Sequence, residues 1–398
     1  MIGSMSSTAE RPRVGLVLSG GGARGAYEVG VLTWLADYAP EVLSAIRVVT
    51  GASVGAVNGT FVASRGLTPE SARALLKVWR GLKVDRVLRF SSRHALSMLW
   101  STGSRWVGNG TSPPVGFFHG SALADLIRQE VRWGGISRQI ANGRLDGVAV
   151  ATTEIGSGRT HLFVEHSPLI PHPRWPHDPS LVAKAGPIRP EHVLASTAIP
   201  LVFAPIQIGE YWYTDGGIRQ NTPISPALRL GAERLLVLSS AGPHQAPEAP
   251  GEFPGLGQLL GKLFNSLFLD RLQWDLDRMD RLNDVLEAGR RAYGDDFPAR
   301  LREGLREIGR RPYQPVQYVT IQPSTDVGVL AAEVLKHPGH LRSRFSRPLE
   351  TLLMSDSQRA ADAASYLLFD GGFASELVAL GRADAAKHAD ALRALQEP

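Results

Sequence analysis

Short apolar runs that end at glycine alternate with helical patterns through the first part of the chain. Residues 13–19 form one such run and residues 47–50 form another. Apolar residues at helical spacing follow the first run, from Ala26 to Leu35, and stop near Pro40. A helix lined with small residues is expected after the second run. Strand, turn and helix repeating at this spacing predict a parallel sheet covered by helices.

The same kind of apolar run recurs later in the chain, and it predicts further strands at residues 147–153, 234–239 and 316–322. We therefore expect an α/β fold with a mainly parallel central sheet sandwiched by helices, and a mostly helical C-terminal extension. The expected parts are a disordered tail over residues 1–12, a main domain over 13–325, and the extension over 326–398, packed on the same domain.

Composition indicates a globular protein without redox-active sulfur. Hydrophobic residues make up 43% of the 398 residues and charged residues 20%, as in ordinary folded domains. The chain has no cysteine, which excludes disulfides, thiolate nucleophiles and cysteine-based metal sites. The N-terminal residues are polar, and no stretch approaches the roughly 20 apolar residues that cross a bilayer. These features predict a soluble, cytoplasmic protein.

The net charge of +5 is mild for a chain of this length. An ordinary solvated surface accounts for it, and attraction to anionic lipid head groups is the alternative. Nucleic acid is not an expected partner, because the arginines are spread along the chain and accompany no motif that reads bases.

The first candidate for chemistry is Ser53, in the sequence Gly-Ala-Ser-Val-Gly at residues 51–55. A serine between a strand and a helix occupies a strained turn that exposes its hydroxyl at the sheet edge. Gly51 and Gly55 leave room for neighbouring strands and for substrate. The N-terminus of the following helix favours the negative charge that develops during acyl transfer. Taken alone, the five residues are explained equally well by a plain turn, and their place between a strand and a helix favours the functional interpretation.

A glycine-rich turn after the first strand is the second candidate. Successive glycines there direct several backbone amides into one concave space, which binds an anion. The spacing also fits the dinucleotide fingerprint, but that interpretation needs an acidic residue at the end of the next strand, where this chain has Ser53. We therefore favour an oxyanion hole. Its candidate residues are Gly20, Gly21, Gly22, Ala23, Arg24 and Gly25.

Asp215 is the third candidate, because it ends a predicted strand and is followed by Gly216 and Gly217. A carboxylate within hydrogen-bond reach of a serine can accept its proton. The same tripeptide occurs at Asp370, where it continues a helical pattern. We interpret Asp370 as a turn that ends a helix.

Taken in order, these blocks resemble the signature blocks of patatin-like phospholipases. The blocks are Gly-Gly-Gly-Ala-Arg-Gly at 20–25, Gly-Ala-Ser-Val-Gly at 51–55 and Asp-Gly-Gly at 215–217. The Ala-Ser-x-x-x-Pro stretch at 195–200, with Asn221 and Pro223, also matches the family pattern. The resemblance covers residues 13–240 and weakens towards the C-terminus.

The resemblance implies a lipid acyl hydrolase of the phospholipase A or lysophospholipase type, with a Ser–Asp dyad and no catalytic histidine. Ser53 would attack the ester, Asp215 would take its proton, and amides around Gly21, Gly22 and Ala23 would hold the oxyanion. Arg24 matches the motif arginine. Neither a cofactor nor a metal is expected, since the reaction needs no redox chemistry or Lewis acid. His161 and His166 lack metal-ligand spacing.

Several alternatives remain open at this stage. An acyltransferase could use the same dyad. If the site were inactive, the chain would be a lipid-binding protein without turnover. A Ser–His–Asp triad would need a histidine such as His244. The expected partner is a lipid or phospholipid ester, with peripheral membrane contact as a further option, and the sequence indicates no protein partner.

Two apolar segments offer candidate membrane or substrate contacts. Leucines and phenylalanines recur at helical spacing between residues 256 and 268, either as an interfacial helix or as a helix packed on the core. Residues 90–118 form either a lid over the site or an ordinary insertion.

Overall fold

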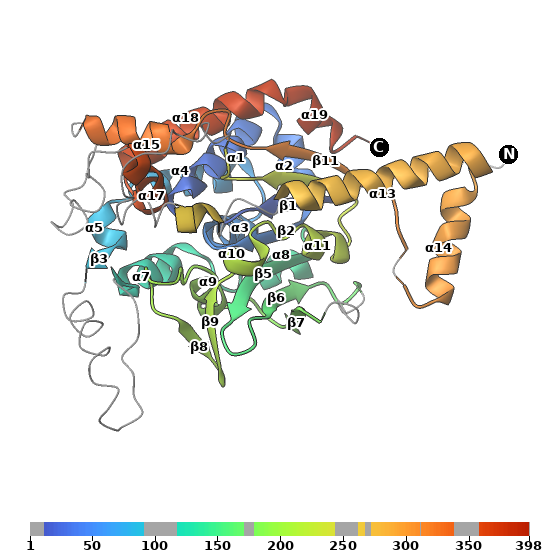
Figure 1. The fold of residues 1–398 in the computed structure, drawn as a ribbon, viewed down its shortest axis with the longest axis horizontal. Helices are drawn as coiled ribbons and strands as arrows, with labels where there is room; N and C mark the ends of the chain where they lie inside the picture. Colours follow the sequence, from blue (N-terminus) through green and yellow to red (C-terminus); the bar gives the residue numbers. More distant parts are fainter. Residues whose placement is uncertain are drawn as a thin grey trace, which may run out of the picture.

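The computed structural model describes residues 12–90, 118–170, 179–242, 262–266, 272–310, 312–337 and 358–397 (Figure 1). All of the tail predicted at residues 1–12 except Pro12 lies outside the described residues. So do nearly all of the candidate lid at 90–118 and most of the apolar segment at 256–268.

A nine-stranded sheet forms the middle layer of the described structure. Its path runs β11-β10-β1-β2-β5-β6-β7, with β9 paired to β5 and β8 paired to β9. Pairing is parallel from β11 through β5 and again between β6 and β7, and it is antiparallel at β5–β6, β5–β9 and β8–β9. The strands are β1 (Val14–Leu18), β2 (Ile46–Ala52), β5 (Gly147–Glu154), β6 (Thr160–His166), β7 (Leu181–Ala185), β8 (Ile206–Ile208), β9 (Tyr211–Asp215), β10 (Arg234–Leu238) and β11 (Gln317–Ile321). A separate ribbon pairs β3 (Arg89–Phe90) with β4 (Phe118–His119).

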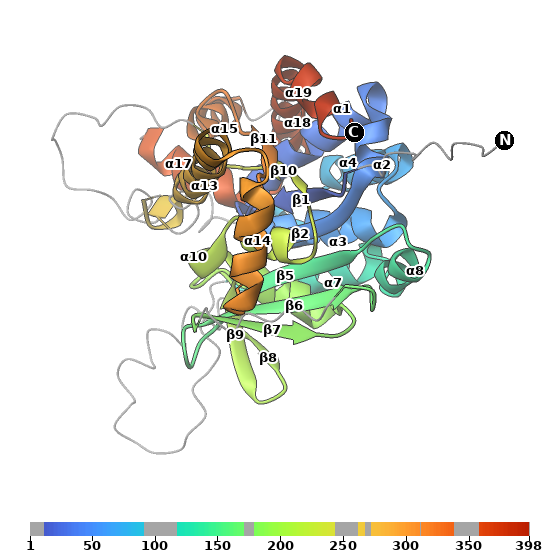
Figure 2. The same cartoon turned by 90° about the vertical axis from the view of Figure 1, so that its right-hand side faces the viewer.

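Helices cover both faces of this sheet (Figure 2). They are η1 (Gly22–Gly25, a 3-10 turn), α1 (Ala26–Tyr38), α2 (Pro40–Ala45), α3 (Val54–Arg65), α4 (Pro69–Arg80), α5 (Val84–Val87), α7 (Ser121–Glu130), α8 (Gly135–Ala141), α9 (Pro190–Ser196), α10 (Gly217–Gln220), α11 (Ile224–Arg229), α13 (Leu272–Tyr293), α14 (Phe297–Glu307), α15 (Val327–Lys336), α17 (Gln358–Leu367), α18 (Gly371–Lys387) and α19 (Ala389–Ala394). The expected α/β class is therefore confirmed.

Strand β1 shows how the sheet separates two cores. Leu16 and Leu18 pack into the larger core, which contains residues of α1, α3, α4 and α18. Val17 points to the opposite face and packs into a second core with residues of α11 and α13. Alternate side chains of a strand point to opposite faces, so a strand covered on both faces is a continuous apolar run. This is why β1, β2, β5 and β10 are predicted well by the sequence.

The described C-terminal helices lie against the N-terminal part of the chain. Helices α1 and α18 approach so closely that a Cβ on Gly30 would lie 2.4 Å from the carbonyl oxygen of Val378. A Cβ on Gly381 would lie 2.2 Å from the carbonyl oxygen of Tyr27. The Tyr27 hydroxyl donates to Asp384 at 3.1 Å. None of the described helices has the length and apolar character needed to cross a membrane.

Candidate active site

The fold brings the three sequence blocks to one edge of the sheet. Strands β1 and β2 are adjacent and parallel, with Leu18 opposite Gly51, so the turns that follow them lie side by side. Strand β9 pairs with β5 and places Asp215 opposite Thr152. The glycine-rich turn, Ser53 and Asp215 therefore lie together.

Ser53 occupies a strained turn between β2 and α3. Its backbone has φ 50 and ψ −127, a conformation that side-chain-bearing residues rarely adopt. A Cβ on Gly51 would lie 2.5 Å from the backbone of Gly55. A Cβ on Gly55 would lie 2.5 Å from the carbonyl oxygen of Leu18. Both glycines are thus required by the close approach of the turn, the helix and the neighbouring strand.

Ser53 and Asp215 form a direct hydrogen bond. The Ser53 hydroxyl donates to Asp215 Oδ2 at 2.6 Å, and the other carboxylate oxygen accepts from the amide of Gly217 at 2.7 Å. Ser53 is 1% exposed and Asp215 is 0% exposed. A Cβ on Gly216 would lie 2.1 Å from the carbonyl oxygen of Ala151, so the turn after Asp215 needs glycine.

Burial controls the ionisation of Asp215. Removal from water raises the pKa of its carboxyl group from 3.8 to about 7, while the hydrogen bonds from Ser53 and Gly217 oppose that rise. At neutral pH the group is therefore divided between its two protonation states. Such a carboxyl group is a stronger base than an ordinary aspartate, and it is still ionised in a large fraction of molecules.

Three backbone amides of the glycine-rich turn have no acceptor within the described part of the chain. The amide of Gly20 donates to the carbonyl of Asn221 at 3.1 Å, and that of Arg24 donates to Gly21 at 3.1 Å. The first amides of a helix have no intrahelical acceptor. The amides of Gly21, Gly22 and Ala23 precede the bonded part of the turn, and they have no hydrogen-bond acceptor among the described residues.

A buried polar chain connects this turn to α4. The side-chain amide of Asn58 donates to the carbonyl of Gly25 at 3.0 Å and to Glu28 at 2.8 Å. Its oxygen accepts from the indole of Trp79 at 2.9 Å. Burial raises the pKa of Glu28 to about 8, so its carboxyl group is largely protonated at neutral pH. The sequence does not indicate these hydrogen bonds, because nothing in the spacing of the four residues predicts contact.

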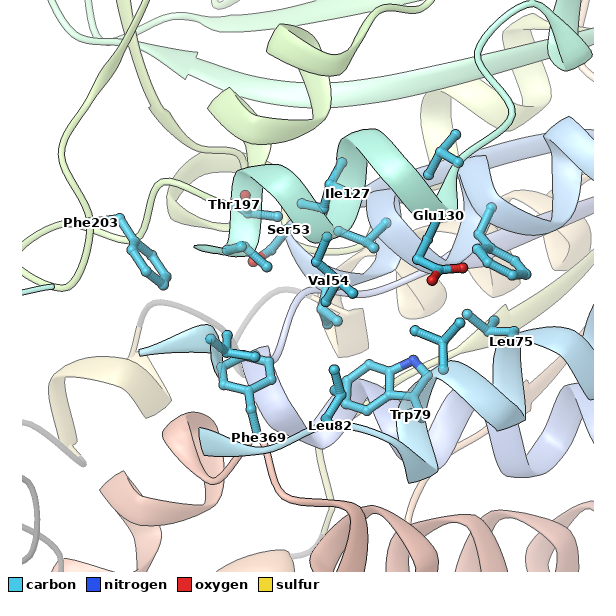
Figure 3. Close-up of a pocket in the computed structure, with 18 of the residues that line it drawn as sticks. Ser53, Val54, Leu75, Trp79, Leu82, Ile127, Glu130, Thr197, Phe203 and Phe369 are labelled. Atoms are coloured by element: carbon cyan, nitrogen blue, oxygen red, sulfur yellow. The ribbon is translucent and has the colours of Figure 1, made fainter. Parts of the chain in front are cut away.

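An apolar pocket opens beside Ser53 (Figure 3). Gly22, Ser53 and Thr197 line the pocket at its polar end. Its remaining lining is apolar apart from Glu130, and consists of Val54, Val57, Phe61, Leu75, Val78, Trp79, Leu82, Val87, Leu123, Leu126, Ile127, Val131, Ile199, Phe203 and Phe369.

The other candidates from the sequence have different surroundings. Asp370 begins α18, where its carboxylate accepts from the amide of Gly372 at 2.7 Å. His161 and His166 lie on β6, and His161 bonds the hydroxyl of Tyr213. No group of three potential metal ligands occurs within the described part of the chain. His244, the histidine considered for a triad, lies outside it.

Ser196 is a site residue whose position the sequence did not predict. It lies in the Ala-Ser-x-x-x-Pro stretch, at the end of α9. Its hydroxyl accepts from the amide of Ser53 at 2.8 Å and donates to the carbonyl of Ala151 at 2.6 Å. The Ser53 amide is thereby occupied, and the strained turn is tied to β5.

We expect Ser196→Ala to lower kcat by about tenfold and to reduce the free energy of unfolding by about 1–3 kcal/mol, because it leaves the buried amide of Ser53 without an acceptor. Ester hydrolysis and urea unfolding measure the two effects. Ser64→Ala is the matched control, since Ser64 is a buried serine at the other end of α3. Loss of stability without loss of kcat in Ser196→Ala would contradict the prediction.

Comparison with known protein families identifies the family of this chain. A family model for patatin-like phospholipase matches residues 16–228, more than half of the chain. The chain therefore belongs to the patatin-like phospholipase family, which confirms the resemblance that the motifs indicate. By this membership it is a lipid acyl hydrolase.

Similar solved structures include three proteins of low sequence identity. VipD from Legionella pneumophila is 15% identical, with 92% of this chain and 67% of that chain covered and a TM-score of 0.37. The type III effector ExoU from Pseudomonas aeruginosa is 16% identical, with 96% and 53% covered and a TM-score of 0.36. Human GIVD cytosolic phospholipase A2, in complex with methyl γ-linolenyl fluorophosphonate, is 12% identical, with 96% and 58% covered and a TM-score of 0.37. This chain spans about half to two thirds of the lengths of these three chains.

Proposed function

We propose that this chain hydrolyses acyl esters of phospholipids or lysophospholipids through a Ser53–Asp215 dyad. The observation that carries the proposal is the 2.6 Å hydrogen bond between the Ser53 hydroxyl and Asp215 at the polar end of an apolar pocket. A nucleophile bonded to a base, next to free backbone amides, is the arrangement that acyl transfer requires.

In the proposed first half of the reaction, Ser53 forms an acyl-enzyme. Its Oγ attacks the ester carbonyl carbon while Asp215 Oδ2 accepts the hydroxyl proton. The amides of Gly21, Gly22 and Ala23 donate to the oxygen that becomes negative in the tetrahedral intermediate. The intermediate collapses by breaking the bond to the alcohol oxygen, and the leaving alcohol takes the proton from Asp215.

Water completes the cycle in the second half. A water oxygen attacks the carbonyl carbon of the acyl-enzyme, and Asp215 accepts a proton from that water molecule. Collapse of the second intermediate breaks the bond to Ser53 Oγ, which takes the proton back from Asp215. The products are a free fatty acid and the original enzyme. A small alcohol in place of water would yield a new ester, which is the acyltransferase alternative.

The pocket supports a fatty acyl group as the part of the substrate that is bound. An acyl chain has no hydrogen-bonding groups, so it gains free energy of transfer from walls such as Phe61, Leu75 and Phe369. Thr197 lies with Ser53 at the polar end. An ester whose carbonyl meets Ser53 can thus place its hydrocarbon along the pocket.

The test of this function is incubation with phosphatidylcholine vesicles, followed by mass spectrometry of the lipid products. We expect free fatty acid, either with lysophospholipid from these vesicles or, for a lysophospholipase, from lysophosphatidylcholine added to them, and no new ester when glycerol is added. A new glycerol ester in place of fatty acid would identify an acyltransferase. Vesicle binding without any product would contradict the proposal and favour a lipid-binding protein.

Leu75 provides a test of acyl binding within the pocket. Figure 3 places Leu75 at the end away from Ser53. We expect Leu75→Trp to lower kcat/KM for p-nitrophenyl palmitate by about tenfold or more relative to p-nitrophenyl butyrate, because the larger side chain shortens the pocket. Leu75→Met conserves volume and serves as the control. Equal changes for both esters would show that the long chain binds elsewhere.

A further inference from the structure

Arg24 connects the glycine-rich turn to a helix near the C-terminus. Its side chain is 3% exposed and does not line the pocket. Nε donates to the hydroxyl of Ser365 at 2.8 Å, and Nη2 donates to Asp362 Oδ1 at 2.6 Å. The guanidinium carbon lies 3.8 Å from the ring centroid of Tyr366. These three partners share one face of α17, so the arginine is held by a single helical surface.

The same helix touches the backbone of the turn. Gly22 has φ +57, and a Cβ there would lie 2.3 Å from the carbonyl oxygen of Tyr366. On the other side, a Cβ on Gly21 would lie 2.0 Å from Ser240 Oγ, which donates to the carbonyl of Gly20 at 2.6 Å. The turn is therefore enclosed between α17 and the residues that follow β10. Its position depends on both.

The partners of Arg24 are themselves fixed in place. The second carboxylate oxygen of Asp362 accepts a hydrogen bond from the side-chain amide of Asn265. The oxygen of that amide accepts from the Tyr366 hydroxyl at 2.8 Å. Ser365 Oγ donates to the backbone carbonyl of Asp362 at 2.6 Å. A carboxylate whose two oxygens both accept hydrogen bonds, one from Arg24 and one from Asn265, is a rigid anchor for the guanidinium group.

We propose that Asp362 and Ser365 are positioning residues for ester hydrolysis, which hold the oxyanion-binding amides through Arg24. Both residues lie beyond residues 16–228, the part that matches the family model. The proposal rests on the proposed function, because it assigns the turn to the oxyanion. Backbone donors act only when they lie about 2.7–3.1 Å from the developing charge. A small displacement of Gly22 therefore affects the transition state more than it affects substrate binding.

The primary experiment compares Asp362→Asn with the wild type in hydrolysis of p-nitrophenyl butyrate. We expect kcat to fall by about tenfold to a hundredfold with KM unchanged, because the lost interaction acts in the transition state. Active enzyme is counted by stoichiometric labelling with a fluorophosphonate, so that unfolded protein does not enter kcat. Ser365→Ala removes one neutral hydrogen bond and should lower kcat by a smaller factor, which keeps the test available if Asp362→Asn folds poorly.

Asp384→Asn is the matched control. Asp384 is a buried carboxylate of the same C-terminal part, but it bonds Tyr27 and Lys387 rather than the turn. Its variant should lose stability and keep kcat for each labelled site. If Asp362 acts through Arg24, Asp362→Asn should also lower kcat by a smaller factor in an Arg24→Lys background, since the two changes remove one interaction.

Suppose that the wild-type enzyme is active, and that Asp362→Asn and Ser365→Ala both keep its kcat for each labelled site. This result would overturn the inference about Asp362 and Ser365 and leave the proposed function in place. The inference would also be overturned if Asp362→Asn lowered kcat by the same factor with Arg24 and with Lys at position 24, because Asp362 would then act by another route. An inactive wild-type enzyme would instead contradict the proposed function, and the inference would fail with it.

Discussion

Ser53→Ala is expected to lower kcat/KM for ester hydrolysis by about 10³-fold or more. The change removes the only atom that can form the acyl-enzyme in the proposed mechanism, yet it leaves the pocket and the turn at residues 20–25 in place. Alanine keeps the Cβ and backbone of the strained turn, so the Ser53→Ala protein should fold normally. Lipid binding should persist, because the apolar walls of the pocket are unchanged.

Two measurements check this result. Hydrolysis of p-nitrophenyl esters gives the loss in rate, and a fluorophosphonate should label the wild-type peptide containing Ser53 but not the Ser53→Ala protein. The control is Ser64→Ala, in the same helix, which should keep both activity and labelling. Hydrolysis that persists at the wild-type rate in Ser53→Ala would disprove the nucleophile.

Asp215→Asn is expected to cause a loss of similar size. An amide of the same shape can still accept the Gly217 amide, but it cannot take the proton from Ser53. We therefore expect kcat/KM to fall by about 10³-fold, while circular dichroism and lipid binding stay as in the wild type. The effect separates loss of the base from loss of the fold.

The pH dependence of wild-type kcat/KM tests the role of the Asp215 carboxyl group independently. Only the ionised carboxylate of Asp215 accepts a proton, and its pKa is about 7. kcat/KM should therefore rise through neutral pH and fall by about tenfold for each pH unit below 7. An acidic limb with the usual aspartate midpoint, near 4, would contradict the raised pKa.

Asp370→Asn is the matched control for Asp215. Both aspartates precede two glycines, and both accept the second glycine amide at 2.7 Å. Asn caps a helix about as well as Asp does, so Asp370→Asn should keep stability and activity. His244→Ala tests the triad alternative, and the dyad requires that this variant stay active. Inactivity of His244→Ala with retained folding would favour a histidine base.

The raised pKa of Asp215 also affects folding. A carboxyl group with a higher pKa in the folded state than in the unfolded state stabilises the fold less as pH rises through that interval. For Asp215 the interval runs from 3.8 to about 7. Asp215→Asn removes this dependence, so its melting temperature should exceed that of the wild type increasingly from pH 4 to pH 7. Such a gain would indicate that the functional carboxylate costs stability.

The sequence predicts the parallel strands from β11 to β5 better than the neighbouring strands β6 and β7. The strands covered on both faces, such as β1 and β10, are apolar runs, and the pattern identifies them. Strands β6 and β7 do not show this apolar pattern, because β6 contains His161 and Glu165 and β7 contains Lys184. Their partners across the sheet, rather than local periodicity, determine their conformation.

The motifs of the candidate site were predictable, but the contacts between them were not. The family blocks identify Ser53 and Asp215 because each block has its own local pattern. Ser196 and Ser53 are 143 positions apart, and Arg24 and Asp362 are 338 apart. No local pattern encodes such pairs, so only the fold brings their side chains together.

The contact of Tyr366 with Gly22, and the place of Phe369 in the pocket wall, have a consequence for the order of events in the cell. During translation Ser53 is synthesised long before α17, and the segments that are made first begin to fold in the meantime. During that interval the nucleophile exists, but one wall of the pocket and the anchor for Arg24 do not. A nascent chain should therefore not hydrolyse the lipids around it. A protease that cuts before α17 should inactivate the enzyme even though Ser53 and Asp215 remain intact.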